Sequence, residues 1–226
     1  MQNARKSNPF GITKAVDLND EQIERLWVKL SADDDSIVTE FDHPASPMPT
    51  YILGAKGSGK THMMRHQAFD LQRLRYEKVG LSVAEGVMSD GYIGLYVRCS
   101  GLHSNRFTGK RQSDELWQQL FAFYFELWLA QHVISLAMAI KDDAPEADEK
   151  LICDGIVALF DKQPAQTISS FRELRDYLSK AQRTLDYEIN NCLINGRLNV
   201  DIITSPGNLI FGIPKCLFKN GLRARG

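Results

Sequence analysis

The sequence predicts an α/β fold in which a parallel β-sheet is flanked by helices and the second half of the chain is rich in helix. Two short apolar runs, residues 50–53 and 92–99, have the β-branched and aromatic content of buried strands. Between them, a glycine-rich stretch at 54–61 leads into a helical pattern at 62–78. The order strand, loop, helix, strand is typical of a βαβ unit, which places two parallel strands in one sheet.

A short helix is predicted to begin after Asn19. Asn19 can cap this helix, and Gln22 stands three residues further on, as in a capping box. The apolar residues that follow share one face of such a helix: Ile23, Leu26, Trp27 and Leu30. Residues 32–49 contain three consecutive aspartates and three prolines and are predicted to form a connecting loop. We therefore expect a lead-in helix and linker at 1–49 and a core at 50–226.

The second half contains one long helical pattern, at residues 113–141, which is apolar on nearly every side. We expect the protein to enclose this helix, because polar side chains interrupt it more often than a membrane span tolerates: Gln118, Gln119, Glu126, Gln131 and His132. Two shorter helices are predicted at 149–161 and 168–190, and residues 208–213 have the composition of a further strand.

The composition is that of a globular protein, since 43% of the residues are apolar and 24% are charged. With 27 basic against 28 acidic residues, the net charge is −1, which excludes a global positive field for nucleic acid or anionic membranes. The four cysteines form no CxxC pair, and no apolar segment follows the basic N-terminus as in a secretory signal. We therefore expect a cytoplasmic protein with reduced thiols and no membrane partner.

The glycine-rich stretch fits the pattern G-x-x-x-x-G-K-[ST] of the phosphate-binding P-loop, or Walker A motif. Chance produces this pattern in about one chain in a hundred of this length. Its glycines let backbone N–H groups converge on phosphate oxygens, Lys60 would reach the β- and γ-phosphates, and the Thr61 hydroxyl would ligate Mg²⁺. The sequence therefore predicts ATP and Mg²⁺ as cofactors, with Lys60 and Thr61 in the catalytic role and Thr61 as the metal ligand. The predicted cofactor-binding residues are consecutive: Gly54, Ala55, Lys56, Gly57, Ser58, Gly59, Lys60 and Thr61.

Hydrolysis of a bound nucleotide also needs an acidic residue after an apolar strand, to hold Mg²⁺, and a group that orients the attacking water. Asp161 follows the apolar run 155–160, but Lys162 stands where a catalytic glutamate is expected. The helical spacing before Asp161 favours a packed helix end over this motif. His62 and His66 have a spacing that suits a metal on a helix, yet no third ligand is in view, so we expect solvated or packed histidines.

A basic loop follows the second apolar run. Residues 99–112 contain no acid, and this part of the chain holds four cations: Arg98, Arg106, Lys110 and Arg111. His103 and Phe107 lie among them, and interleaved basic and aromatic residues are typical of surfaces that contact nucleic acid. A nucleotide on a neighbouring subunit is a second candidate partner, and a solvated loop without a partner is a third interpretation.

Four blocks of the sequence resemble bacterial ATPases of the AAA class called ORC/Cdc6-like: NPFGITKAVDLNDEQIERLW, YILGAKGSGKTHMMR, IGLYVRCSGLHSNRF and FELWLAQ. The resemblance implies an AAA-type P-loop NTPase with residues 54–61 as its Walker A motif. Proteins of this kind are often encoded among anti-phage defence genes, where ATP-dependent assembly is coupled to sensing or to a toxic effector. The resemblance thus implies a homo-oligomer or an effector protein as partner.

The resemblance also leads us to expect a further strand ending in Asp-Glu, which this chain lacks. We therefore expect an amino-terminal portion of such an ATPase, truncated before Walker B, that binds ATP and hydrolyses it slowly, if at all. Two other functions stay open: a non-catalytic interaction module whose surface is ordered by ATP, and a P-loop kinase of small molecules. Hydrolysis of ATP distinguishes an ATPase from the non-catalytic interaction module. Transfer of γ-phosphate to a nucleoside or sugar identifies the kinase.

Overall fold

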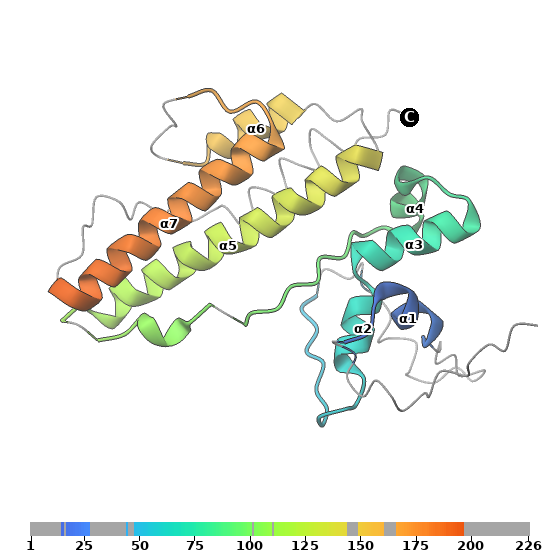
Figure 1. The fold of residues 1–226 in the computed structure, drawn as a ribbon, viewed down its shortest axis with the longest axis horizontal. Coiled ribbons are helices and arrows are strands. Elements are labelled where there is room, and N and C mark those ends of the chain that lie inside the picture. Colours follow the sequence, from blue (N-terminus) through green and yellow to red (C-terminus); the bar gives the residue numbers. More distant parts are fainter. Residues whose placement is uncertain are drawn as a thin grey trace, which may run out of the picture. The chain divides into compact units, whose positions relative to one another are not determined.

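The structure, a computed structural model, describes residues 15, 17–27, 44, 48–100, 102–109, 111–143, 149–160 and 166–196. These residues form helices joined by loops (Figure 1). The chain divides into two compact units, Met1–Tyr96 (unit 1) and Val97–Gly226 (unit 2). The expected division into a lead-in at 1–49 and a core at 50–226 remains a prediction.

Unit 1 contains four short helices among its described residues: α1 (Asp20–Arg25), α2 (Lys60–His66), α3 (Phe69–Val79) and α4 (Val83–Asp90). The capping box predicted for α1 is confirmed. The Asn19 Oδ1 atom accepts a hydrogen bond from the Gln22 amide at 2.8 Å, and the Gln22 side chain accepts one from the Asn19 amide at 2.9 Å. The apolar stripe is confirmed in part, because Ile23 is fully buried whereas half of Leu26 is exposed.

The single helix predicted at 62–78 is two helices, because the chain breaks at Gln67 and Ala68. Ala68 has an extended backbone (φ −72°, ψ 152°) and begins α3. The backbone of Gly94 lies directly against this break, since a Cβ atom on Gly94 would overlap the Gln67 carbonyl oxygen. The Phe69 amide donates a hydrogen bond to the Gly94 carbonyl at 2.8 Å, so a distant segment of the chain occupies the place where a continuous helix would run.

Helix α4 was not predicted, and it packs tightly on α3. A Cβ atom on Gly86 would overlap the ring of Tyr76, so only glycine fits this contact. The Tyr76 hydroxyl donates to the Asp90 carboxylate at 2.7 Å, which connects the end of α4 to α3. Burial and this hydrogen bond raise the pKa of Tyr76. The buried side chain of Gln72 donates to the same carboxylate at 3.0 Å.

The predicted parallel sheet is wrong for the described part of the chain, which contains no β-strand. Residues 50–53 are not buried either, since Tyr51 is 85% and Leu53 is 90% exposed. Residues 92–99 are held to α3 at Gly94, whose amide donates to the Gln72 side chain at 2.9 Å. A strand exists only through a backbone ladder with a neighbour, and a short apolar run does not reveal whether that neighbour is present. The strand predicted at 208–213 lies outside the described residues.

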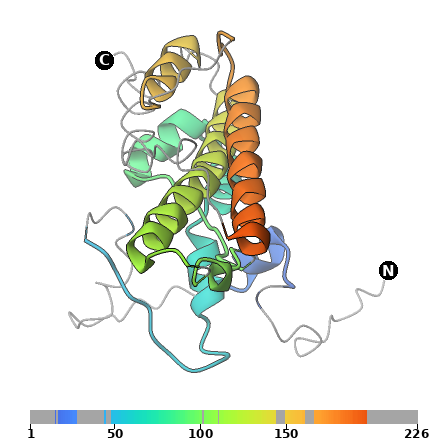
Figure 2. The ribbon, with the colours of Figure 1, turned by 90° about the vertical axis from the view of Figure 1, so that its left-hand side faces the viewer.

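Unit 2 is built on two long helices, α5 (Asp114–Asp143) and α7 (Phe171–Asn195). They lie side by side and run in opposite directions (Figures 1 and 2). The shorter helix α6 (Glu149–Val157) packs near the start of α7, and a single 3₁₀ turn, η2 (Ser104–Arg106), precedes α5. The three helices predicted in this half are thus confirmed, although α6 ends four residues early and α7 extends five residues further than predicted.

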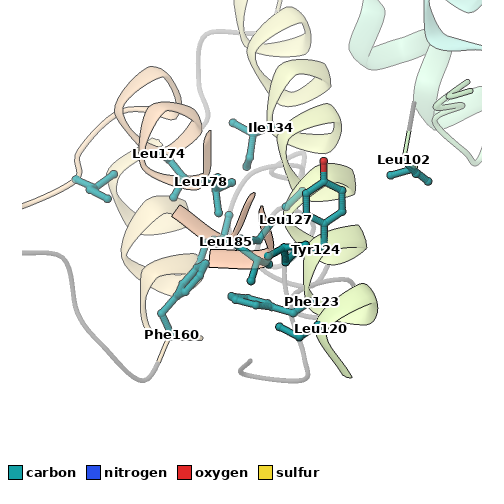
Figure 3. Close-up of a cluster of buried hydrophobic side chains, with 14 of the residues drawn as sticks. Leu102, Leu120, Phe123, Tyr124, Leu127, Ile134, Phe160, Leu174, Leu178 and Leu185 are labelled. Carbon is teal, nitrogen blue, oxygen red and sulfur yellow. The ribbon is translucent and has the colours of Figure 1, made fainter. Parts of the chain in front are cut away.

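The core of unit 2 consists of apolar side chains that α5 and α7 direct at one another (Figure 3). Leu120, Leu127 and Ile134 of α5 are fully buried, as are Leu178 and Leu185 of α7. Over Asp114–Lys141, α5 is long and apolar enough to cross a membrane by length and composition, and 39% of its most apolar window is buried. One face of α5 packs against α7, and the rest of this window is not buried, so the expectation that the protein encloses the helix is met only in part.

Candidate functional site

The glycine-rich loop, residues 54–61, leads directly into α2, whose first residue is Lys60. Gly57 and Gly59 adopt φ values of 89° and 83°, in the left-handed region that side chains with a Cβ atom disfavour. The Ser58 amide donates to the Ala55 carbonyl at 3.2 Å, which closes a turn, and the Met63 amide donates to the Gly59 carbonyl at 3.0 Å, which begins the helix. Two of the three motif glycines are therefore required by backbone conformation.

Gly54 is restricted by space instead. A Cβ atom at this position would lie 2.6 Å from the Ser58 hydroxyl oxygen and 3.7 Å from the Lys60 ammonium nitrogen. The loop thus folds back on its own beginning, and the missing side chain at Gly54 leaves room for Ser58 and Lys60. All three glycines contribute to one compact loop, as the motif predicts.

The Lys60 ammonium group lies at the centre of this loop. It donates to the Gly54 carbonyl at 2.6 Å, to the Ala55 carbonyl at 2.7 Å and to the Ser58 hydroxyl at 3.2 Å. An ammonium group has three donors, so these three acceptors satisfy it. An anion that enters the loop must take over some of these hydrogen bonds, and its oxygens would then replace neutral carbonyls as partners of the positive charge.

The first turn of α2 contains no acidic residue, and its second residue is Thr61, which is half-buried. The loop itself is exposed to solvent from Leu53 to Gly59. A positive charge, a hydroxyl group and the amides of a glycine-rich loop therefore meet at an accessible place without a neighbouring carboxylate in the first helical turn. This donor set fits phosphate oxygens and a hydrated Mg²⁺ ion.

Polar contacts hold α2 against the segment that contains α1, since α2 buries none of its own residues. The guanidinium group of Arg65 donates to the carbonyls of Ala15 and Leu18 at 2.8 and 2.7 Å and to the Asp20 carboxylate at 2.8 Å. No local pattern in the sequence identifies the role of Arg65, because its acceptors lie more than 40 residues away along the chain.

His62 and His66 pack against α1. The rings of Trp27 and His66 are stacked at 3.8 Å, and His62 lies in the same stack at 5.9 Å from Trp27. Burial lowers the pKa of His62. The His66 ring also approaches the Glu24 carboxylate at 3.3 Å. No group of three or more His, Cys, Asp or Glu side chains that could hold a metal occurs among the described residues.

The described residues of the predicted basic loop differ in their surroundings. Arg106 forms an ion pair with Asp186 of α7 at 2.5 Å, and its guanidinium group lies over the ring of Tyr124 at 4.7 Å. Arg98 and Arg111 are exposed. Lys110 lies outside the described residues, as does Asp161, the candidate for the hydrolytic half of the site.

Comparison with known proteins gives one match: a family model described as ORC-CDC6-like matches residues 8–225, which is nearly the whole chain. No curated protein and no solved structure matches the chain. The matched range includes the glycine-rich loop and the helices α1, α5, α6 and α7.

Proposed function

Because the chain belongs to the ORC-CDC6-like family, whose members are related to AAA-type ATPases and bind nucleotides, we propose that residues 54–61 are its Walker A motif and bind ATP with Mg²⁺. The observation that carries the proposal is the position of the Lys60 ammonium group inside a loop shaped by two left-handed glycines. A lysine on a solvated helix would extend into water. Here it is folded over the loop in which the β- and γ-phosphates would lie.

Lys60 and Thr61 would divide the work between them. On binding, Lys60 exchanges the carbonyls of Gly54 and Ala55 for phosphate oxygens, so its ammonium group gains negatively charged acceptors in place of neutral ones. The hydroxyl of Thr61, at the second residue of α2, is placed to ligate Mg²⁺. Bound Mg²⁺ would neutralise charge on the phosphates, and the amides of Gly57 to Lys60 would donate to them.

Calorimetric titration of the whole chain with ATP, with and without Mg²⁺, tests the proposal. We expect binding in the wild type and a loss of affinity of about ten- to hundredfold in Lys60→Ala, because one charge-assisted contact is removed. Lys180→Ala is a matched control, since Lys180 lies on the exposed side of α7 in unit 2. Equal affinity of the wild type and Lys60→Ala would overturn the assignment of the loop.

We expect hydrolysis by this chain to be slow. A fast ATPase needs an acidic residue close to Mg²⁺, and the candidate in the sequence, Asp161, is followed by Lys162 where a catalytic glutamate is expected. The measurement is release of inorganic phosphate with Lys60→Ala as the blank. Turnover above this blank at about 1 s⁻¹ or more, a usual rate for enzymes, would contradict the expectation. Transfer of phosphate to a nucleoside or sugar instead of water would favour the alternative that the protein is a P-loop kinase of small molecules.

The role of ATP that we propose is to order a surface for assembly, with a second copy of the chain or an effector protein as partner, in the cytoplasm. Resemblance to ATPases found among anti-phage defence genes supports this role. Size-exclusion chromatography with light scattering tests it: ATP and a non-hydrolysable analogue should both raise the molecular mass, and Lys60→Ala should not respond. A phage challenge of cells expressing the wild type or Lys60→Ala tests the defence role, with equal plaque counts as the negative result.

A further inference from the structure

We infer that Arg65 is a positioning residue for the P-loop, which sets the orientation of Lys60 and Thr61 by docking α2 on the segment before α1. The inference rests on the proposed function of residues 54–61 as an ATP site. The hydrogen bonds of Arg65 go to the segment around α1, so Arg65 acts on Lys60 and Thr61 through the helix that it shares with them.

The orientation of α2 is not set by an apolar core. None of its seven residues is buried, and on the other side of the loop Tyr51 and Leu53 are exposed. A helix of this length has little stability of its own and takes its position from tertiary contacts. The contacts that hold α2 therefore decide where its first two residues, Lys60 and Thr61, point.

Arg65 provides the most specific of these contacts. Its Nη1 atom donates to two carbonyls, those of Ala15 and Leu18, and its Nη2 atom donates to the Asp20 carboxylate. Its side chain is only 15% exposed, so these hydrogen bonds are largely shielded from water. A planar guanidinium group that bridges three acceptors fixes both distance and direction, which a single point charge does not.

Thr61 and Arg65 stand four residues apart and therefore lie on one face of α2. A movement of the face that Arg65 docks on the α1 segment therefore moves Thr61 as well. A rotation or shift of α2 after loss of Arg65 displaces this hydroxyl from the Mg²⁺ position and moves the base of Lys60. Sites of this kind lose activity when their reacting groups move by about 1 Å.

The fluorescence of Trp27 reports whether α2 is docked on the segment that contains α1. Its ring is stacked on His66 at 3.8 Å with an angle of 8° between the planes, and His66 is the residue after Arg65. A stacked imidazole changes the emission of an indole, so separation of α1 from α2 should alter the fluorescence of Trp27. The Trp27→Phe variant removes the emission of Trp27 and leaves that of Trp117 and Trp128 in unit 2, so the difference from the wild type gives the contribution of Trp27.

The experiment compares Arg65→Ala, Arg65→Lys and Asp20→Asn with Arg25→Ala in the full chain. Arg25 is an exposed arginine in the last turn of α1 and serves as the matched control. For each variant, we measure the emission of Trp27 and the affinity for ATP with and without Mg²⁺. The ratio of the two affinities reports the Thr61 position, whereas a general loss of stability lowers both affinities alike.

For Arg65→Ala we expect altered Trp27 emission, about tenfold weaker binding of ATP with Mg²⁺, and a smaller gain from Mg²⁺ than in the wild type. Arg65→Lys should have an ATP affinity between those of Arg65→Ala and the wild type, because lysine keeps the positive charge but lacks the planar guanidinium group. Arg25→Ala should match the wild type. If Arg65→Ala does not fold by circular dichroism, Arg65→Lys and Asp20→Asn carry the test, with expected losses of about threefold.

Three results would overturn the inference. One is altered Trp27 emission with unchanged affinity, a second is an equal loss of affinity with and without Mg²⁺, and a third is no change in either quantity. Failure of the proposed function looks different, since the wild type would then bind ATP no better than Lys60→Ala, and the inference would fall with it.

Discussion

In unit 2, α5 and α7 bury a continuous set of leucine, isoleucine and aromatic side chains, whereas in unit 1 the short helices bury fewer apolar side chains and are also joined by directional contacts from Arg65, Gln72 and Tyr76. An apolar core tolerates small shifts because packing has no preferred direction, but a hydrogen bond is lost when its partners move by an ångström. The candidate site lies in unit 1, so its geometry depends on a few separable contacts.

The largest effect is expected in unit 2, from truncation of a fully buried core side chain. Leu178→Ala should lower the free energy of unfolding by about 2–5 kcal/mol, because it removes apolar contact and leaves a cavity. Tyr187→Ala, on the same helix but 65% exposed, is the control and should change it by less than about 0.5 kcal/mol. Urea unfolding measures both, and similar losses in the two variants would contradict the core described for unit 2.

In unit 1 the largest loss should come from a change to one backbone contact. Gly94→Ala places a methyl group in the space of the Gln67 carbonyl oxygen, so α3 and the segment at Gly94 must separate. We expect a loss of about 1–3 kcal/mol, the usual range for overpacking. Ser89→Ala, an exposed change in α4, is the control. A Gly94→Ala protein as stable as the control would show that this contact does not hold unit 1 together.

A substitution that strains the backbone without a steric overlap should lower stability less than Gly94→Ala. Gly59 has a φ of 83°, and a Cβ atom at this position would meet nothing within 4 Å, so Gly59→Ala tests backbone conformation alone. The left-handed region costs an alanine about 1–2 kcal/mol, and asparagine tolerates it better. Thermal unfolding should therefore rank Gly59→Asn between the wild type and Gly59→Ala, and an unchanged midpoint in Gly59→Ala would mean that the loop has another conformation in solution.

The smallest effect concerns pH and an acidic residue of unit 2. Burial raises the pKa of Glu149, but hydrogen bonds from Lys141 and from the Phe171 amide outweigh it and leave the pKa below its usual 4.5. A carboxyl group with a lowered pKa stabilises the folded state above the unfolded value, and this contribution disappears as pH falls through the folded value. Glu149→Gln should therefore destabilise the protein at pH 7, and its difference from the wild type should shrink as pH falls below 4.5. A difference that persists unchanged at pH 3 would argue against this contact.

Features that depend on neighbouring residues were predicted well. The capping box of α1 needs only Asn19 and Gln22, and the ladder of hydrogen bonds in α5 and α7 closes within each turn, so helical spacing identifies both helices. The motif also places glycine at positions 57 and 59, where the structure has left-handed φ values of 89° and 83°. For such features, the residues that interact lie within a few positions of one another in the sequence.

Features that depend on distant partners were missed or predicted wrongly. The break between α2 and α3 is made by Gly94, more than 20 residues downstream, and Arg65 finds its acceptors more than 40 residues upstream. Arg106 was expected on an exposed basic loop, but Asp186, 80 residues away, holds it against α7. The two predicted strands failed for the same reason, since a strand requires a neighbour that an apolar run does not specify.

The sequence by itself determined α1 with its cap and the long helices α5 and α7, because hydrogen bonds and steric limits within a few residues are sufficient for them. Only the tertiary structure decided which of these pieces touch: α5 with α7, Gly94 with the start of α3, and Arg65 with the segment before α1. Such contacts join residues that are far apart in the sequence and come together only in the folded chain. The spacing of residues along the chain therefore does not predict them.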